Sequence, residues 1–333
     1  MRFSNVILAL SGIGLSVAAS VAGCGNGDTA GAGGSTGTTT GTATCTPKKA
    51  FPCSPDNCKC KVPDLECLGV VDNTGLMKFG LRMSDLVISK PPALATGLVA
   101  SVVAGSVTPS LASCNLNGSG TFSWLLEFDL TAGTLTTGGA KPVADPTKGY
   151  SFTKEMVSGV PIAPVTYPIK VDASGKFDVM MGVDLNVPIY LDATATMAVV
   201  LPLKRGRLTM GTLSKSQNCI GTYNAKGLDT ANSCLSDTKH PLFNVGAALD
   251  GIITLEDADK VLISSLNESL CVALSGNGAM YGMKNAMNVT VCKRDASMKI
   301  LFAGDSCSMA GGTCTDSVAL GADFAASSVK VNN

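Results

Sequence analysis

The chain has 333 residues, and its 25 Lys and Arg residues balance its 25 Asp and Glu residues, so its formal net charge is zero. This balance, without a basic patch or stripe, excludes the electrostatic footprint of a nucleic-acid-binding protein. Charged residues make up 15% of the chain, while Gly, Thr, Ser, Val and Ala are abundant, as is typical of extracellular β-proteins.

The first 23 residues predict an export signal. Arg2 provides a short charged start, an apolar stretch follows, and small residues lead to Gly23. This order of charge, apolar core and small residues is typical of a cleaved signal peptide. A transmembrane anchor is the alternative, because about 18 apolar residues can span a bilayer. Ser11, Ser16 and Ser20 interrupt the stretch and favour the signal peptide.

The end of this segment, Val21-Ala22-Gly23-Cys24, resembles the lipobox of bacterial lipoproteins. The resemblance covers only the first two dozen residues. It implies cleavage before Cys24, a lipid on its thiol, and attachment to a membrane through that lipid. Gly25, in place of Asp, implies sorting to the outer membrane in enteric-type bacteria, and so a place on the cell envelope or surface. The alternative is an ordinary signal cut elsewhere, with Cys24 as a spare thiol.

Two segments separate this signal from the body of the protein. Residues 24–44 are almost entirely Gly, Thr, Ala and Ser, which predicts a flexible tether. Residues 45–70 combine closely spaced cysteines with four prolines, which predicts a disulfide-stapled module with little regular structure. The cysteines of this module are Cys45, Cys53, Cys58, Cys60 and Cys67.

The chain contains 13 cysteines, and setting Cys24 aside leaves an even number for disulfides. Because the module has an odd number, we expect Cys114 to pair with one of its cysteines. Proximity predicts three further pairs, namely Cys219–Cys234, Cys271–Cys292 and Cys307–Cys314. Zinc, iron–sulfur and haem sites are disfavoured, because the chain has a single histidine and neither paired CxxC motifs nor a CxxCH sequence.

Residues 71–333 show the alternation of apolar and polar residues that is typical of half-buried strands. One run is Met77, Phe79, Leu81 and Met83; a second is Phe122, Trp124, Leu126, Phe128 and Leu130; the longest extends over residues 177–191. We expect the longest run to bend near Gly182 or break at Pro188. The sequences at 131–134 and 172–175 are typical of hairpin connections. The sequence therefore predicts an all-β, antiparallel sandwich or jelly-roll-like body, with a disulfide-stapled part over 211–333.

One helix is predicted near residues 254–266. Thr254 and Asp257 form a capping-box-like start, and Leu255, Ala258, Leu262 and Leu266 share a helical face. Residues 91–105 fit either a helix or a strand.

The strongest carboxylate pair is Glu127 and Asp129, which point to the same side of one strand. The stretch partly resembles the active-site strand of retaining glycosidases with a concanavalin-like sandwich. That resemblance implies a nucleophile here and a second Glu one or two places further on, but Thr131 and Ala132 stand there. Glu127 and Asp129 are therefore weak catalytic candidates, and two carboxylates on the wet face of a strand explain them as well.

Other sites are less supported. His240 lies before Pro241 in an expected loop, without a Gly-x-Ser-x-Gly motif to supply a nucleophile. Asp250 and Asp257 partly fit a calcium loop, but Gly246 and Ala248, which offer no side-chain oxygen, stand at two of its ligand positions. No cofactor is therefore expected. Calcium held by scattered loop carboxylates is left open. Trp124 is expected to face the core. The better-placed aromatic contacts for a glycan or protein would be Tyr150, Tyr190 and Tyr223, if they are exposed.

These observations favour a lipid-anchored, disulfide-rich envelope protein with a non-catalytic binding, adhesion or structural role. Two alternatives remain. One is a secreted glycan hydrolase that uses carboxylates such as Glu127 and Asp129. The other is a lipid-binding carrier, in which the long alternating strands form the wall of an apolar cavity. An apolar tunnel in the structure would favour the carrier.

Overall fold

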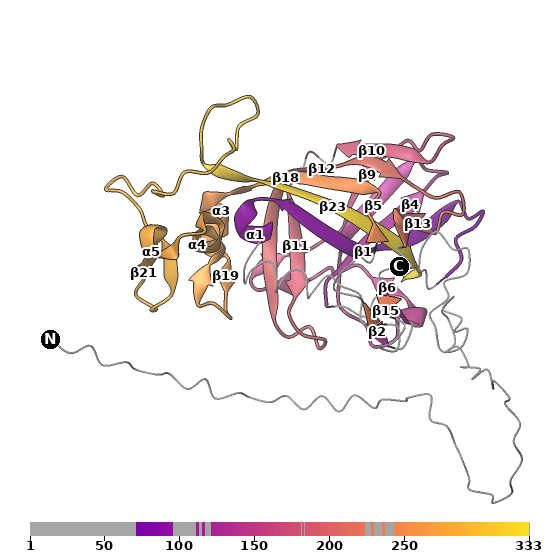
Figure 1. Ribbon diagram of the computed structural model, residues 1–333, viewed down its shortest axis with the longest axis horizontal. Helices are drawn as coiled ribbons and strands as arrows, with labels where there is room; N and C mark the ends of the chain where they lie inside the picture. The colour runs from indigo at the N-terminus through magenta and orange to yellow at the C-terminus, as the bar shows by residue number, and fades with distance from the viewer. Residues whose placement is uncertain are drawn as a thin grey trace, which may run out of the picture. The chain divides into compact units, whose positions relative to one another are not determined.

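The computed structural model describes residues 71–95, 111–112, 115–116, 121–180, 182, 184–223, 228–229, 235–236 and 243–332 (Figure 1). The predicted signal, tether and cysteine-rich module therefore lie outside the described residues. The described part is mostly β-structure with short helices, which confirms the all-β, antiparallel class expected from the alternation.

The principal element is one antiparallel sheet of ten strands, whose main path runs β10-β12-β18-β23-β1-β4-β5-β9. The strands of this path are β1 (Lys78–Lys90), β4 (Ser123–Asp129), β5 (Thr134–Ala140), β9 (Val165–Pro168), β10 (Lys176–Met180), β12 (Ala198–Thr212), β18 (Ala247–Thr254) and β23 (Ser317–Val329). Two further strands branch from it: β11 (Leu185–Tyr190) pairs with β12, and β13 (Cys219–Ile220) pairs with β23. A single sheet therefore supplies the walls of the core that the sequence assigned to a sandwich.

This sheet curls until its two terminal strands lie next to each other. β9 and β10 are consecutive in the chain and lie close together, but no ladder joins them. A tight turn precedes β10, where the Asp172 carboxylate accepts hydrogen bonds from the backbone N–H groups of Ser174 (2.8 Å) and Lys176 (2.9 Å). The predicted turn at 172–175 thus forms, but it does not join paired strands. The turn predicted at 131–134 does, since β4 and β5 form a hairpin.

β23 is the central strand of the sheet. It pairs with β18 on one side and with β1 on the other, so the end of the described chain bridges segments far apart in sequence. The hydroxyl of Ser327 in β23 donates a 3.1 Å hydrogen bond to Ser84 in β1, which lies 243 positions earlier. Figure 1 shows β23 running beside β18 and β1.

Short helices and minor strands lie at two places beside this sheet (Figure 1). The helices are α1 (Pro92–Ala95), η1 (Pro146–Lys148), α3 (Leu255–Lys260), α4 (Leu270–Ser275) and α5 (Gly278–Tyr281). A four-stranded sheet contains β19 (Leu262–Ile263), β20 (Glu268–Ser269), β22 (Thr290–Cys292) and β21 (Gly282–Lys284). Paired short strands are β2 (Leu111–Ala112) with β3 (Asn115–Leu116), β6 (Tyr150–Ser151) with β24 (Val331–Asn332), β7 (Met156–Val157) with β8 (Val160–Pro161), β14 (Thr222–Tyr223) with β17 (Phe243–Asn244), and β15 (Leu228–Asp229) with β16 (Leu235–Ser236). Figure 1 shows α1, α3, α4, α5, β19 and β21 at one end of the large sheet, and β2, β6 and β15 near the other.

The predicted helix near 254–266 begins as expected but ends early. The Thr254 hydroxyl caps α3 by accepting a hydrogen bond from the backbone N–H of Asp257 at 3.2 Å. The helix ends at Lys260, because the carbonyl of Val261 accepts from the N–H of Leu270 and draws the chain into the β19–β20 pair. Leu262 is consequently 42% exposed, so its predicted place on a buried helical face was wrong.

The longest alternating run divides near Gly182, as predicted. Gly182 has a φ of 59° and lies between β10 and β11, a backbone conformation that glycine adopts at low cost. Pro188 does not break its strand. It lies within β11, opposite Val200 of β12. β11 pairs on one side only, and such edge positions tolerate a proline.

Disulfides fasten the C-terminal part of the described chain. Cys271 pairs with Cys292, and Cys307 pairs with Cys314, which confirms two of the pairs predicted from proximity. Cys219 is also disulfide-bonded. The remaining candidates lie outside the described residues: Cys24, Cys45, Cys53, Cys58, Cys60, Cys67, Cys114 and Cys234. Within 91–105, α1 forms a helix up to Ala95, and residues 96–105 are not described.

Candidate functional site

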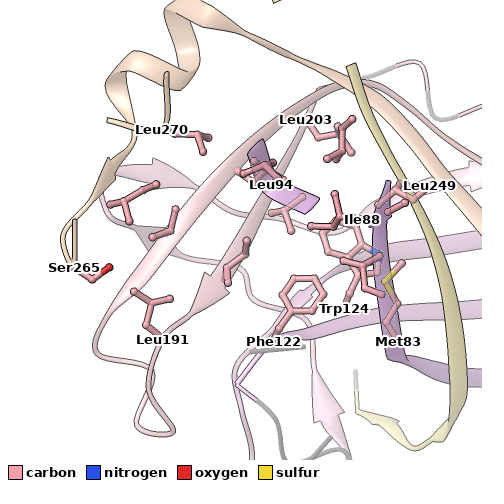
Figure 2. A pocket seen from close by; sticks show the side chains of 18 of the residues that line it. Met83, Ile88, Leu94, Phe122, Trp124, Leu191, Leu203, Leu249, Ser265 and Leu270 are labelled. Carbon is pink, nitrogen blue, oxygen red and sulfur yellow. The ribbon is translucent and has the colours of Figure 1, made fainter. Parts of the chain in front are cut away.

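An apolar cavity of about 90 Å³ lies between the concave sheet and the helices that cover one end of it (Figure 2). Among the described residues that line it, every one except Ser265 is apolar. The lining comprises Met83, Leu86, Ile88, Leu94, Phe122, Trp124, Val187, Ile189, Leu191, Val199, Leu201, Leu203, Leu249, Ile263, Ser265, Leu266, Leu270, Leu320 and Ala322.

A β-bulge in β1 turns its second half toward this cavity. The register with β23 shifts between Met83 and Asp85, so two residues of β1 occupy the space of one. Beyond the shift, Leu86 and Ile88 line the cavity, whereas Val87 is 49% exposed on the opposite side. Uninterrupted alternation from Met83 would have placed Val87 inward and Leu86 outward.

The β11–β12 ribbon forms the facing wall. Its cavity-lining residues are ladder partners, with Val187 opposite Leu201 and Ile189 opposite Val199. The alternate residues Tyr190 and Val200 are buried on the other face, in a small cluster with residues of and beside the β7–β8 hairpin. Both faces of the ribbon are therefore covered, which explains why its sequence is apolar at nearly every position.

The cover of the cavity comes from α1, α4 and the β19–β20 hairpin, through Leu94, Leu270 and Ile263. A polar network on the outer side fastens these elements. The Asp259 carboxylate accepts hydrogen bonds from the Ser269 hydroxyl and the Cys292 backbone N–H, each at 2.8 Å, and from the Arg294 guanidinium at 2.9 Å. The Cys271–Cys292 disulfide joins α4 to β22 at the same place. The polar groups thus stabilise the cover while the cavity itself stays apolar.

One further ion pair links this cover to the wall. The Asp257 carboxylate belongs to α3, which packs against α4, and lies 2.9 Å from the ammonium of Lys204, just before a register shift in β12. Burial raises the pKa of Asp257, but the hydrogen bonds from Thr254, Lys204 and Lys260 outweigh burial and hold the pKa well below its usual range. The carboxylate therefore stays ionised in the acid range where an ordinary Asp takes up a proton.

The cavity has a closed inner end and an accessible outer end. Met83, Trp124 and Leu249 are buried at the inner end, whereas Leu191 and Leu266 are half-buried and Ser265 is exposed. The lining residues Leu86, Ile88, Ile189, Val199 and Leu201 are also half-buried. Figure 2 shows Leu191 and Ser265 on the side away from Met83, Trp124 and Leu249. We refer to Leu191, Ser265 and Leu266 as the rim, and to Met83, Trp124 and Leu249 as the floor.

Polar groups near both ends are already engaged. At the floor, the Trp124 indole N–H donates a 2.7 Å hydrogen bond to the Thr137 hydroxyl, which itself donates to the Leu125 carbonyl. Next to the rim, the Asp192 carboxylate accepts from Thr194, Thr196 and Met197 in the turn between β11 and β12. The Thr194 hydroxyl contributes most to holding the pKa of Asp192 well below its usual range. These bonds orient both side chains and leave apolar surface facing the cavity.

The predicted carboxylate pair does not line this cavity. Glu127 lies 3.4 Å from the ammonium of Lys78, and Asp129 accepts a 2.8 Å hydrogen bond from the Ala132 N–H in its own hairpin turn. Both are thus accounted for by local structure. Trp124 faces the core, as predicted.

Two of the three aromatic candidates do not meet the condition that they be exposed. Tyr150 and Tyr190 are buried, with 0% and 1% exposure. The Tyr223 side chain and His240 lie outside the described residues.

The calcium-loop hypothesis is not supported at Asp250. This residue lies within β18 opposite Gly321, and its carboxylate is 3.3 Å from the Arg207 guanidinium. Among the described residues, potential metal ligands converge at Asp259 with Cys271 and Cys292, and at Asp316 with Cys307 and Cys314. Both groups contain a disulfide, whose sulfurs are not thiolates, so each is explained as a structural cross-link.

The alternating pattern had placed several cavity residues on a buried face, including Met83, Trp124 and Val187. It missed Leu86, Ile88 and Leu270, which reach the cavity through the bulge and through the covering helix. The sequence signal that could have indicated the cavity wall is the run of aliphatic residues in both β11 and β12, on either side of the turn at Asp192.

No protein-family model, curated protein sequence or solved structure matches this chain. Within the described ranges, no helix has the length and apolarity needed to cross a membrane.

Proposed function

We propose that this protein binds an apolar ligand without chemical turnover, and that a lipid on Cys24 attaches it to a bacterial cell envelope. The apolar cavity between the sheet and its cover carries the proposal. Of the roles that the sequence left open, this observation favours the lipid-binding carrier over adhesion or a purely structural role.

The composition of the lining gives the physical reason. A buried water makes about three hydrogen bonds. The described lining residues carry a single hydroxyl, at the rim, and so offer too few partners for water in the interior. An apolar ligand meets no such penalty, and its burial contributes about 25 cal/mol per Å² of apolar surface removed from water. The site is therefore better suited to an apolar group than to water or a polar substrate.

A glycan hydrolase is less well supported. Retaining glycosidases need two carboxyl groups about 5–5.5 Å apart, one as nucleophile and one as acid/base. Glu127 faces the ammonium of Lys78, and Asp129 closes a turn. Neither arrangement supplies a proton donor.

Localisation to the envelope is supported by the lipobox-like Val21-Ala22-Gly23-Cys24 and by the disulfides, because these persist in oxidising compartments outside the cytosol. The substitution Cys24→Ala tests this part of the proposal. We expect it to abolish incorporation of a labelled fatty acid and to release the protein from membranes. Continued labelling of the Cys24→Ala protein would contradict the anchor.

Binding is tested by filling the cavity. Ile88 and Val87 are neighbours in β1, but only Ile88 lines the cavity, so Ile88→Trp and Val87→Trp form a matched pair. We expect the wild type and Val87→Trp to enhance the fluorescence of a bound apolar dye and to carry lipid that can be extracted with organic solvent. Ile88→Trp should lose at least tenfold in dye affinity.

A second filling variant on the opposite wall, Ile189→Trp, guards against misfolding of the first. Circular dichroism and the thermal midpoint identify which variants remain folded. Equal dye binding by the wild type and both folded filling variants would contradict the cavity as the binding site. The absence of dye binding and of extractable lipid in the Cys24→Ala protein, whose cavity cannot be occupied by an acyl group of its own, would contradict ligand binding altogether.

A further inference from the structure

We propose that the ligand of this cavity is a linear acyl chain of an amphiphile, which enters methyl end first and leaves its polar head at the rim. This inference rests on the proposed apolar-ligand site and specifies both the class of ligand and its direction. Three features of the cavity support it: its size, the difference in exposure between its floor and its rim, and the position of the one hydroxyl among its described residues.

The size of the cavity favours a slim group. Its volume of about 90 Å³ is well below the range of about 300–1,000 Å³ that is typical of sites for drug-sized ligands. A fused-ring compound such as a sterol would have to displace several side chains of the wall at once. A polymethylene chain is narrow and can adopt the shape of the existing space. The aliphatic side chains of the lining can also adjust their rotamers around it.

The difference in exposure between floor and rim sets the direction. Trp124 and Met83 at the floor are 3% and 1% exposed, whereas the rim residues Leu191 and Leu266 are half-buried and Ser265 is exposed. A polar or charged head placed at the floor would lose its hydration without gaining partners, at a cost of several kcal/mol. The same head at the rim stays in water. The methyl end must therefore lie at the floor.

The rim provides polar contact at one side. Ser265 carries the only hydroxyl among the described residues of the lining, and its loop connects β19 to β20. On the facing ribbon, the Asp192 carboxylate is occupied by its own turn. The described residues of the lining thus present no charge that would select an ionic head, so recognition depends on the chain rather than on the head.

The protein has a natural reporter for this orientation. Trp124 is the only tryptophan in the sequence and lies at the floor. A nitroxide quenches tryptophan fluorescence only at short range, so its position along a bound chain can be measured. The full chain with Cys24→Ala is used, because this variant carries no acyl group of its own that could occupy the cavity.

Three spin-labelled compounds are compared on this protein: stearic acid with a nitroxide near its methyl end, stearic acid with a nitroxide near its carboxyl group, and a sterol with a nitroxide on its ring system. We expect the methyl-end label to quench Trp124 at least threefold more than the carboxyl-end label, and the sterol to quench weakly. Equal or stronger quenching by the carboxyl-end label would overturn the orientation. Strong saturable quenching by the sterol would overturn the linear ligand.

A matched control moves the reporter to the outside. The double variant Val87→Trp, Trp124→Phe carries its only tryptophan on the opposite side of β1. We expect all three labels to quench the fluorescence of this outer tryptophan to the same extent. That result would establish that the quenching of Trp124 reports the cavity and not adsorption to the surface. If no label quenches Trp124, the apolar-ligand site itself is overturned, an outcome distinct from a failure of the orientation alone.

Discussion

The two ends of the same curved sheet differ in how they are filled. At one end aromatic rings occupy the interior, with Phe128 stacked on Phe79 at 5.2 Å and edge-on to Phe177 at 5.4 Å. At the other end the sheet carries mostly aliphatic side chains, and an apolar cavity remains between the wall and its cover. The residues at both ends belong to one hydrophobic cluster. Burial alone therefore does not distinguish a packed core from a binding site.

The largest expected difference comes from truncating a side chain at each end. Phe128→Ala would remove a fully buried ring and leave a void in the filled end, at a cost of about 3–5 kcal/mol in the free energy of unfolding. Leu201→Ala would enlarge an existing cavity at a half-buried position, at a cost of roughly 1–2 kcal/mol, below the usual range for a buried leucine. Urea unfolding curves measure both. Equal costs would show that the cavity end is packed as tightly as the aromatic end.

Adding a methyl group sharpens the same comparison. A Cβ at Gly211 would overlap the ring of Phe177, where the aromatic end has no spare room. A Cβ at Gly251 would overlap the end of the Leu203 side chain to a similar extent and would lie 3.1 Å from the Lys204 carbonyl oxygen. Leu203 borders the cavity and can move into it, so that only the milder contact with Lys204 remains. We expect Gly211→Ala to cost about 1–3 kcal/mol and Gly251→Ala to cost less than about 1 kcal/mol.

Gly251→Ala carries an additional expectation that Gly211→Ala does not. Because Leu203 would move into the cavity, Gly251→Ala should weaken dye binding while Gly211→Ala leaves it unchanged. Thermal melts and dye titrations on the same samples check both statements. A larger loss of stability in Gly251→Ala would contradict the spare room around Leu203.

Acid should affect the cover through Asp257. The pKa of this group is lowered in the folded state, so its contribution to stability is present above the unfolded pKa of about 3.9 and is lost as the pH falls through the acid range. Between about pH 5 and about pH 2, the urea midpoint of the wild type should fall more steeply than that of Asp257→Asn. Parallel curves for the two proteins would show that the bonds with Thr254, Lys204 and Lys260 do not stabilise the fold.

The smallest effect is expected at the carboxylate that the sequence singled out. Glu127, whose side chain is 11% exposed, pairs with Lys78, whose side chain is 48% exposed, and a pair with one partner in water contributes about 1 kcal/mol or less. Glu127→Gln should therefore change the unfolding free energy by less than about 1 kcal/mol and leave dye binding unchanged. Loss of a measurable glycan-hydrolysing activity in Glu127→Gln would reverse this assignment.

The sequence predicted the class of the fold well, because its signals are local. Alternation placed Leu126 and Phe128 on a buried face, Thr254 marked the start of a helix, and short separations identified the Cys271–Cys292 and Cys307–Cys314 pairs. The end of that helix depended on a ladder with residues further along, which no local pattern encodes. The alternation of apolar and polar residues is also the same in two packed sheets as in a single sheet that curls around its core.

The cavity could not be predicted for a related reason. Trp124 and Phe128 occupy equivalent positions in one alternating run, yet one borders a cavity and the other is packed between rings. The difference depends on which side chains arrive from β11, β12 and the cover. The bulge at Met83 that turns Leu86 and Ile88 inward contains no proline or glycine that would indicate it in the sequence.

The central position of β23 has a consequence for how the protein is made. β1 is the first strand of the sheet to be synthesised, but its partner β23 follows much later, since Ser84 and Ser327 are 243 positions apart. β18 also pairs with β23. Such distant pairing slows folding, because the entropy of closing the loop must be overcome before contacts form. Until β23 is synthesised, the growing chain lacks the strand that lies between β18 and β1. The export proposed from the first 23 residues would benefit from this delay, because a chain that has not yet assembled its sheet can still pass through a translocation channel.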